Sequence, residues 1–563
     1  MALLGPLSAS VIGYKSAMRE IEAPVLIVGG SLVGMSAALL LAHHGVRPLV
    51  VEHHRGTAIH PRAAMITQRT MEIFRTVGIE QIVMQKSDEQ FVQDGAIMAL
   101  ESLTGKELAF FIANLNEGVR DISPSLRLFI TQSLLEPLLK ARAEELGADL
   151  QFATEMISFE QDGRATTAEI RHRDTGEIMR VTSRYMLAAD GSHSRIREKL
   201  GIPMLGHGVF SKSVTIYFKG DVGPLLRDRN LSVMYVVNPT LSGFFRIEKP
   251  FTSGFLAVHW LGDPENPVTD VSTGLTEEGA LALLRAAIGD SDVPISIENI
   301  MQWEAMADTA ERFDEGRVFL AGDAAHVMPP SGGFGGNTGV QDAHNIAWKL
   351  ALVLKGLAGA DLLATYESER RPAGQFTVEQ AYSRYVTRSA PYLRSENMQP
   401  IENDLHIECG YCYNSRAVIA DSDGPPPGRM NPRESKGRPG SRAPHLYLEK
   451  GGAPISTLDL FGRNFTMLTG REAARWRESA HTAARQSTVD LDVYSIGGTA
   501  PGALGDSSHA FPAAYGISPS GAVLVRPDGF VAWRAKTSEG ASPVAITHAL
   551  ASILCLPGPR KSA

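Results

Sequence analysis

The chain has 563 residues, 44% of them hydrophobic and 21% charged, which is the composition of an ordinary globular protein. This length predicts roughly three or four domains and a core large enough to bury a sizeable cofactor. The net charge of -8 offers no basic surface for nucleic acid, so a nucleic-acid-binding function is excluded. Three cysteines are too few for a disulfide framework, and we expect a cytoplasmic protein.

The first feature along the chain is an uncharged stretch, Val25 to Ala42, that has the length of a membrane helix. Three glycines interrupt this stretch, so we expect no contact with a membrane. Residues 25–28 are typical of a buried strand, residues 29–34 of a tight turn, and residues 35–44 of a helix that ends at Gly45.

A second short apolar strand follows and ends in an acid, Glu52, 18 residues after Gly34. A strand, a glycine turn, a helix and a strand in this order predict a dinucleotide-binding βαβ unit. The carboxylate accepts hydrogen bonds from an adenosine ribose and repels a 2′-phosphate, which favours FAD or NAD over NADP at this site. The amides of the turn and of the helix N-terminus bind the pyrophosphate. The turn residues are Gly29, Gly30, Ser31 and Gly34, with Ser31 in place of the usual middle glycine.

Two later segments add to this pattern. A strand runs into Asp190-Gly191 and continues as D-G-S-H-S-R-I-R over residues 190–197. Another buried strand, residues 317–321, leads into G-D-A-A-H at 322–326 and then into a glycine-dense turn at 329–339. Helical periodicity begins at about Val340. We therefore expect the N-terminal amides of this helix to face any ligand for which the glycine turn leaves room.

With these three motifs in order, residues 24 to about 385 resemble the aromatic hydroxylases of the single-component (class A) FAD-dependent monooxygenases. The resemblance implies FAD as cofactor, NAD(P)H as electron donor and O2 as co-substrate. It places Asp190 and Gly191 behind the pyrophosphate, near the NAD(P)H path, and Asp323 at a ribitol or ribose hydroxyl. It also implies that Arg62 lies on a mobile loop near the phosphates and that Gln132 contacts the flavin. Many relatives carry an adenine-packing arginine after the ribose acid, where this chain has His53.

The chemistry of a flavin C4a-hydroperoxide explains the remaining candidates. Reduced flavin is negatively charged, and a helix N-terminus contributes roughly half a positive charge beside it. The catalytic candidates are Pro329, whose carbonyl orients a substrate hydroxyl in relatives, together with Gly336 and Asn337, whose amides face the flavin edge. The predicted cofactor-binding residues are Gly29, Gly30, Ser31, Gly34, Glu52, Arg62, Gln132, Asp190, Gly191, Asp323, Gly335, Gly336 and Asn337, and no metal is expected.

The expected fold is α/β: a Rossmann-like FAD-binding domain interleaved with a mixed-sheet substrate domain, followed by a thioredoxin-like α/β domain. Aromatic residues Tyr217, Phe245, Trp260 and Trp303 fall in the substrate sheet, but strand aromatics are mostly core, so none is assigned to the site. The expected divisions are an N-terminal arm (1–20), the FAD-binding domain (21–204 and 301–420), the substrate sheet (205–300), a linker or surface loop (421–445) and the thioredoxin-like domain (446–563).

We expect no separate chemistry from the C-terminal domain or from the remaining cysteines and histidines. The tail contains no C-x-x-C, so a structural role or a role in a homo-oligomer is expected of it. Cys409 and Cys412 have that spacing but fall in an expected strand before the linker, where buried structural thiols are favoured. The histidines, which are His43, His44, His53, His54 and His60, are spread over a helix end and loops and predict no metal site. His326 is expected to be a structural residue.

The predicted function is therefore FAD-dependent hydroxylation of a small aromatic substrate, with a polycyclic polyketide of antibiotic biosynthesis favoured by the length and the tail. Two alternatives stay open: hydroxylation of simple phenols, and a non-hydroxylating flavoprotein that sequesters a reactive intermediate. A flavin halogenase is disfavoured because no W-x-W-x-I-P segment occurs. A plain NAD dehydrogenase would not need the two later motifs.

Overall fold

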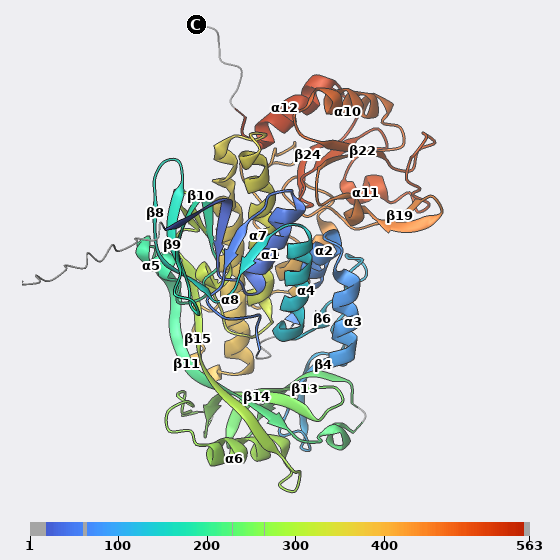
Figure 1. The fold of residues 1–563 in the computed structure, drawn as a ribbon. Helices are drawn as coiled ribbons and strands as arrows, with labels where there is room; N and C mark the ends of the chain where they lie inside the picture. The colour runs from blue at the N-terminus through green and yellow to red at the C-terminus, as the bar shows by residue number, and fades with distance from the viewer. Residues whose placement is uncertain (1–17, 60–64, 228, 264, 557–563) are drawn as a thin grey trace, which may run out of the picture.

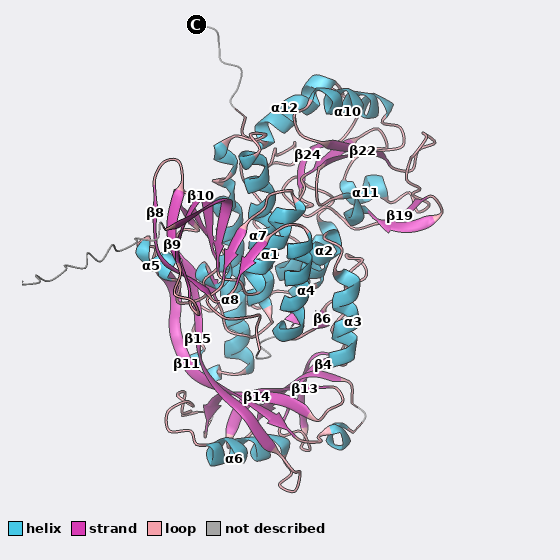
Figure 2. Cartoon of the chain, in the orientation of Figure 1, coloured by secondary structure: helices cyan, strands magenta, loops and turns pink. Residues whose placement is uncertain are grey.

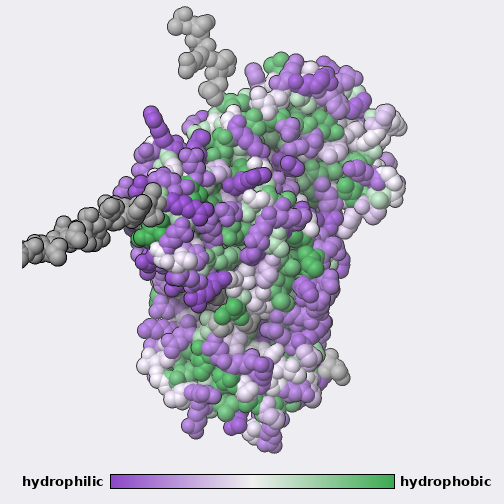
Figure 3. All heavy atoms as spheres, in the orientation of Figure 1, coloured by the Kyte–Doolittle hydropathy of each residue, from purple (hydrophilic) through white to green (hydrophobic). Residues whose placement is uncertain are grey.

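Two large sheets and a third, smaller one organise the chain in the computed structural model, which describes residues 18–59, 65–227, 229–263 and 265–556 (Figure 1). The first large sheet lies in the middle of the molecule, the second lies below it with one helix on its outer side, and the third belongs to the C-terminal part (Figure 2). Polar side chains cover most of the face in Figure 3, with apolar ones in scattered patches. Within the described ranges, no helix has the length and apolarity needed to cross a bilayer.

The first sheet is the parallel core of a dinucleotide-binding fold. Its main path runs β16-β17-β10-β1-β2-β7, and the pairs from β17 to β7 are all parallel. Because both faces are covered, its central strands are continuous apolar runs rather than alternating ones. The strands are β1 (Arg19–Val28), β2 (Leu49–Val51), β7 (Asp149–Gln151), β8 (Thr154–Gln161), β9 (Thr166–His172), β10 (Ile178–Ala188), β16 (Asp314–Glu315) and β17 (Val318–Leu320).

Helices cover this sheet, and α1 begins at its carboxyl edge, directly after β1 and the glycine turn. Helix α1 packs between α4 and α7, which explains why nearly all of its residues are buried and why it lacks a polar face. The helices of this region are α1 (Leu32–His43), α2 (Gln68–Thr76), α3 (Glu80–Gln90), α4 (Gln132–Glu145), α5 (Arg195–Lys199), α7 (Phe334–Leu354), α8 (Thr365–Arg388) and α9 (Asp404–Cys409). A short ribbon, β3 (Met65–Ile66) with β6 (Leu128–Phe129), lies beside them.

The second sheet has the order β18-β15-β11-β14-β13-β12-β4-β5, so segments from four distant parts of the chain build it. Its outer face packs on α6 (Glu277–Ile288), and its inner face is turned toward the FAD-binding region (Figure 1). The strands are β4 (Ala96–Leu100), β5 (Glu107–Ile112), β11 (Met204–Lys219), β12 (Leu231–Val237), β13 (Leu241–Glu248), β14 (Ser253–Leu261), β15 (Ser296–Ala310) and β18 (His326–Val327).

The C-terminal part forms a four-stranded sheet in the order β22-β21-β23-β24, with β21 and β22 parallel and the other pairs antiparallel. A parallel pair followed by an antiparallel hairpin is the thioredoxin-like arrangement, and the predicted hairpin at residues 527–529 is confirmed. Its elements are β19 (Tyr447–Lys450), β20 (Ala453–Ser456), β21 (Phe465–Thr469), α10 (Ala474–Gln486), β22 (Leu491–Ser495), α11 (Phe511–Tyr515), β23 (Ala522–Val525), β24 (Val531–Ala535) and α12 (Pro543–Ile553).

Two local expectations are wrong. The helix predicted from Val340 begins at Phe334, because the glycines that suggest a turn are the residues that let α7 approach its neighbours. Cys409 ends helix α9 instead of lying in a strand. Cys409 is buried, as expected, and Cys412 is half-buried.

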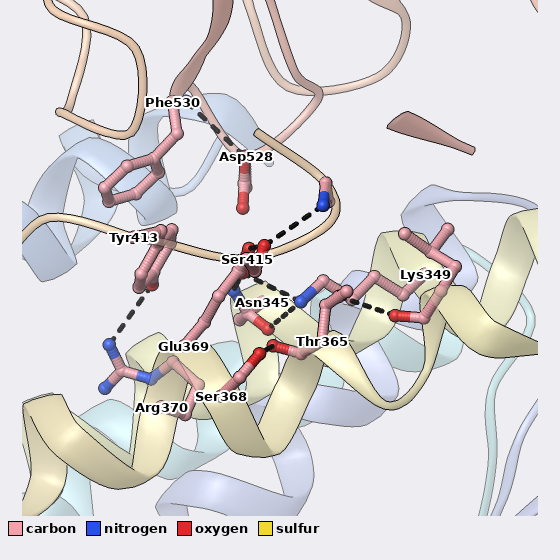
Figure 4. Close-up of polar contacts among 12 residues, drawn as sticks. Asn345, Lys349, Thr365, Ser368, Glu369, Arg370, Tyr413, Ser415, Asp528 and Phe530 are labelled. Carbon is pink, nitrogen blue, oxygen red and sulfur yellow. Dashed lines mark hydrogen bonds and ion pairs between the residues drawn. The ribbon is translucent and has the colours of Figure 1, made fainter. Parts of the chain in front are cut away.

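A buried acid, Glu369 of α8, joins the C-terminal domain to the FAD-binding region (Figure 4). Its carboxylate accepts hydrogen bonds from Arg526 Nη1 at 2.6 Å and from Lys349 Nζ at 2.8 Å. Asn345 Nδ2 and the Ser415 hydroxyl each donate to it at 2.6 Å. Burial lowers the pKa of Lys349 to about 8, and although burial alone would raise the pKa of Glu369, the two cations hold it well below its ordinary range. Residues of α7 and α8 and of the C-terminal sheet therefore share one buried charge cluster.

We predict that Arg526→Leu lowers the free energy of unfolding by about 3–5 kcal/mol, because it leaves buried carboxylates without their cation. The matched control is Arg416→Leu, which removes an exposed pair with Asp361 and should cost less than about 1 kcal/mol. Chemical unfolding followed by tryptophan fluorescence measures both, since Arg526 lies 5.2 Å from the Trp348 ring. Equal effects of the two substitutions would contradict the role of this cluster.

Candidate active site

The glycine turn after β1 has the close contacts that a dinucleotide site requires. Gly29 has a φ of +102°, and a Cβ on Gly34 would lie 1.8 Å from the Gly29 carbonyl oxygen. A Cβ on Gly30 would lie 2.7 Å from Cβ of Glu52. Ser31 is the N-cap of α1 in an extended conformation. These contacts leave no room for side chains at the three glycines, so the backbone itself faces the site.

Glu52 lies at the end of β2 beside this turn. Its Oε2 accepts from the Gly30 amide at 2.6 Å, and its Oε1 accepts from the His54 amide at 2.8 Å. Burial opposes ionisation, but these backbone hydrogen bonds hold the pKa of Glu52 below its ordinary value. The histidines were expected to be scattered, but His53 and His54 both contact Glu52. The ligand atoms of these three residues lie close enough together to hold a metal ion. The carboxylate is ionised and ordered at the position predicted for the ribose.

The segment that begins at Asp190 is held in place by hydrogen bonds. Asp190 Oδ1 accepts from the Ser194 hydroxyl at 2.6 Å, and Ser194 Oγ accepts from the Arg197 amide at 3.0 Å. The Arg197 guanidinium donates to the Ala324 carbonyl at 3.1 Å, which joins this segment to the G-D-A-A-H segment. Burial raises the pKa of Asp190. Gly191, with a φ of +87°, borders open space.

The G-D-A-A-H segment forms η2 (Gly322–Ala324) after β17 and leaves Asp323 exposed. The neighbouring His326 is buried, and its Nε2 lies 2.6 Å from Asp342 Oδ2. Asp342 also accepts from the Gly322 amide at 3.1 Å and from Arg370 Nε at 2.8 Å. His326 is therefore a structural residue, as predicted, and Asp323 is the acid that faces outward.

Helices α1 and α7 converge on this segment because two glycines accept one valine. A Cβ on Gly322 would lie 2.8 Å from Val33 Cγ2, and a Cβ on Gly339 would lie 2.4 Å from the same atom. Neither helix has an acidic residue in its first turn. Two helix N-termini, each equivalent to about half a positive charge, therefore lie close together without an acid of their own.

The N-terminus of α7 places the predicted flavin-facing residues in one turn. Gly333 is the N-cap with a φ of +66°, so the Gly335 and Gly336 amides belong to the group without an intrahelical acceptor. The Asn337 amide lies one position further on, and its side chain accepts from the Thr67 amide at 2.9 Å and donates to the Met65 carbonyl at 2.8 Å. Asn337 thus ties α7 to β3.

Gln132, at the start of α4, contacts the glycine turn from the other side. Its Nε2 donates to Ser31 Oγ and to Glu136 Oε1, both at 2.7 Å. Glu136 is buried and also accepts from the Ala58 amide at 2.7 Å, a role that sequence reasoning missed. The spacing Gln132–Glu136 on one helix face was the available signal. Arg62 lies outside the described residues.

The inner face of the second sheet supplies aromatic side chains. Tyr217 and Trp303 lie on this face, whereas Phe245 packs in the core on the α6 side. Three rings surround His259 at centroid distances of 5.1–5.8 Å, and burial lowers its pKa to about 3, so it is neutral. Pro329 is buried in the loop between β18 and α7. Sequence reasoning missed His259, because nothing in its strand distinguishes it from a core residue.

Comparison with known proteins identifies this arrangement. A family described as FAD binding domain matches residues 22–381, and one described as aromatic-ring hydroxylase, C-terminal, matches residues 436–557. The chain belongs to the FAD-dependent aromatic-ring hydroxylases. FAD is the cofactor of this hydroxylase, and its function is FAD-dependent aromatic hydroxylation.

Individual relatives cover almost the whole hydroxylase. It is 50% identical over 95% of its length, and 98% of the relative's, to a 4-methyl-5-nitrocatechol 5-monooxygenase of Burkholderia sp.. It is 37% identical to the tetracenomycin A2 monooxygenase-dioxygenase of Streptomyces glaucescens, over 92% and 94% of the two chains. The solved structure of aklavinone-11 hydroxylase with FAD and aklavinone matches with a TM-score of 0.87 at 34% identity, over 96% of this chain and 100% of that one.

The residues of this hydroxylase fit FAD. The close-packed glycine turn carries no side chains that would keep a diphosphate from the backbone, and the two helix N-termini beside it favour negative charge. The ionised Glu52 and the exposed Asp323 are acceptors for sugar hydroxyls at two separate points. A dinucleotide with two polyol groups offers a hydroxyl donor to each of these acids.

We predict that Asp323→Ala weakens FAD binding about 10- to 100-fold, because a carboxylate-to-hydroxyl hydrogen bond is lost. Titration of the apoprotein with FAD, followed by flavin fluorescence, measures the change. Asp361→Ala is the control, since Asp361 pairs with Arg416 on the surface. Unchanged FAD affinity in the Asp323 variant would remove Asp323 from the cofactor site.

Proposed function

We propose that this hydroxylase adds one oxygen atom from O2 to a single-ring phenol or catechol that carries a nitro group, using electrons from NAD(P)H. The observation that carries this proposal is the 50% identity to a nitrocatechol monooxygenase over 540 residues, against 34–38% for five related polyketide hydroxylases. The match spans both the FAD-binding region and the sheet that we assign to the substrate.

FAD, when bound, accepts a hydride from NAD(P)H and activates O2 for transfer of one oxygen atom to the ring. In our assignment, Glu52 and Asp323 bind its sugar hydroxyls. The Ser31 amide and the first amides of α1 bind the diphosphate, since the Gly30 amide already donates to Glu52. Hydrogen bonds to Ser31 and Glu136 hold the Gln132 side chain beside the glycine turn. Asp190 and Gly191 support this site from behind.

At the reacting end, the amides of Gly335 and Gly336 stabilise negative charge at the flavin edge. The Asn337 side chain holds that turn against β3 and does not contact the substrate. The Pro329 carbonyl accepts a hydrogen bond from a substrate hydroxyl, which favours the electron-rich, partly ionised form of the ring. The inner face of the second sheet excludes water with Tyr217, Trp303 and other aromatic side chains.

A polycyclic substrate is the second candidate. It is supported by the TM-score of 0.87 to aklavinone-11 hydroxylase in complex with FAD and aklavinone. In either case we assign the C-terminal domain a structural role through the Glu369 cluster, because its Arg526 pairs with Glu369 of α8.

We predict that 4-nitrocatechol stimulates NAD(P)H oxidation more strongly than a three-ring hydroxyanthraquinone does. Oxygen insertion at the carbon that bears the nitro group yields a hydroxyquinone and one nitrite, and insertion at a C–H carbon yields a product heavier by one oxygen atom. Cofactor oxidation, nitrite release and product mass are measured together. Stimulation only by the anthraquinone would support the second candidate, and oxidation with no oxygenated product would favour a protein that binds without hydroxylating.

We predict that Gly336→Pro slows reduction of bound FAD roughly a hundredfold while FAD is retained, because one donor to developing charge is lost. Anaerobic stopped-flow reduction by NAD(P)H measures the rate. The control is Gly336→Ala, which keeps the amide but places a Cβ 2.8 Å from Leu32 Cδ2, so it reports the effect of bulk alone. Equal slowing by the two substitutions would exclude the amide as the cause.

A further inference from the structure

A single buried arginine, Arg246 of β13, faces the interior of the proposed substrate region. Its strand neighbour Phe245 packs on the α6 side of the sheet. Because side chains alternate along a strand, Arg246 and Phe244 point to the opposite, inner face. The residue is only 4% exposed. A charged side chain in such a place normally pairs with an acid.

Among the residues that the structure describes, Arg246 has no acid as a partner. It makes no hydrogen bond and no ion pair with any residue in the described part of the chain, and its Nε is buried without an acceptor. Its guanidinium lies 3.9 Å from the centre of the Phe129 ring and 4.9 Å from that of Phe91. Glu248, on the same strand, acts on it only through space and is itself bonded to Gln90 at 3.2 Å. Burial lowers the pKa of Arg246 to about 9, so the group is still a cation at neutral pH.

The position of Arg246 connects it to the reacting end of the site. Phe129, on which the guanidinium stacks, pairs with Met65 across the β3–β6 ribbon. The Met65 carbonyl accepts from Asn337 in the first turns of α7, and a Cβ on Gly333 would lie 2.8 Å from Met65 Cβ. Met65 is therefore the one residue between the Phe129 ring, on which Arg246 stacks, and the N-terminus of α7.

Stacking on two rings stabilises a guanidinium without using its N–H donors, and it fixes the plane in which the donors point. A planar group with two neighbouring oxygen atoms matches this fork in a bidentate manner. Both a nitro group and the ionised edge of a catechol have this form. A ring without such a pair of oxygen atoms forms weaker hydrogen bonds with the guanidinium.

We propose that Arg246 binds a pair of neighbouring, negatively charged oxygen atoms on the aromatic substrate and selects for the ionised or nitro-substituted ring. This inference rests on the proposed function, since it names the group through which the same site recognises its substrate. Arg246 fixes the orientation of the ring and stabilises its anionic form.

The test compares two ligands in the FAD-loaded protein. 4-Nitrocatechol changes colour when it ionises, so its absorbance reports both binding and the pKa of the bound phenol, and catechol is the neutral counterpart. We expect the native protein to lower the pKa of bound 4-nitrocatechol below that of the free compound. Arg246→Met should weaken its binding about 10- to 100-fold, abolish the pKa shift and change catechol binding less than about threefold.

Two further variants control for structure. Arg388→Met also removes a guanidinium stacked on a ring, 5.0 Å from Phe111, but at a half-buried position, and it should leave the colour shift in place. Arg246→Lys keeps the charge but not the fork, so it should keep part of the pKa shift while it weakens the binding of 4-nitrocatechol, whereas Arg246→Gln should abolish the pKa shift. This pair decides the question if Arg246→Met loses FAD. Equal weakening of both ligands by Arg246→Met would overturn the inference and leave Arg246 as a packing residue. Failure of the native protein to bind either ligand would instead overturn the proposed function.

Discussion

The structure of the site depends on the close approach of two helix N-termini around one side chain. Val33 of α1 packs against Gly322 and Gly339, so α1, α7 and the η2 turn meet at van der Waals distance. Any side chain at either glycine would push the helices apart and with them the amides at their N-termini. Because both N-termini point to the same place, this packing gathers backbone N–H donors there, beside the carboxylates of Glu52 and Glu136. A diphosphate and a reduced, anionic flavin ring are groups that such donors stabilise.

Buried ion pairs hold these helices from behind. Asp342 of α7 bonds His326 and Arg370, and Glu369 of α8 bonds Lys349 and Arg526. Each acid has more than one partner, which is how a charge survives away from water. The C-terminal domain supplies one of these cations, so it contributes to the rigidity of α7 although it lies far from the site (Figures 1 and 4).

Sequence patterns predicted the parts of the molecule in which the backbone carries the chemistry. Gly29, Gly34, Glu52 and Asp323 could be proposed as site residues because a turn, a close approach and an acid at a strand end each require one residue type. The start of α7 was missed since glycine has low helix propensity, and tertiary packing overrode that preference at Gly335 and Gly336. His259 and Arg246 were also missed. A strand residue shows its role only when the neighbouring strands reveal which face it occupies and whether it has a partner.

The second sheet has a consequence for how the protein is made. Its strands come from residues 96–112, 204–261, 296–310 and 326–327, and the first sheet pairs β1 with β10 and β10 with β17. Neither sheet is complete until more than half of the chain has left the ribosome. With so many long-range pairings, folding is expected to be slow, and unpaired strand edges stay exposed during synthesis. The cofactor site, which includes the turn after β17, can form only at that late stage.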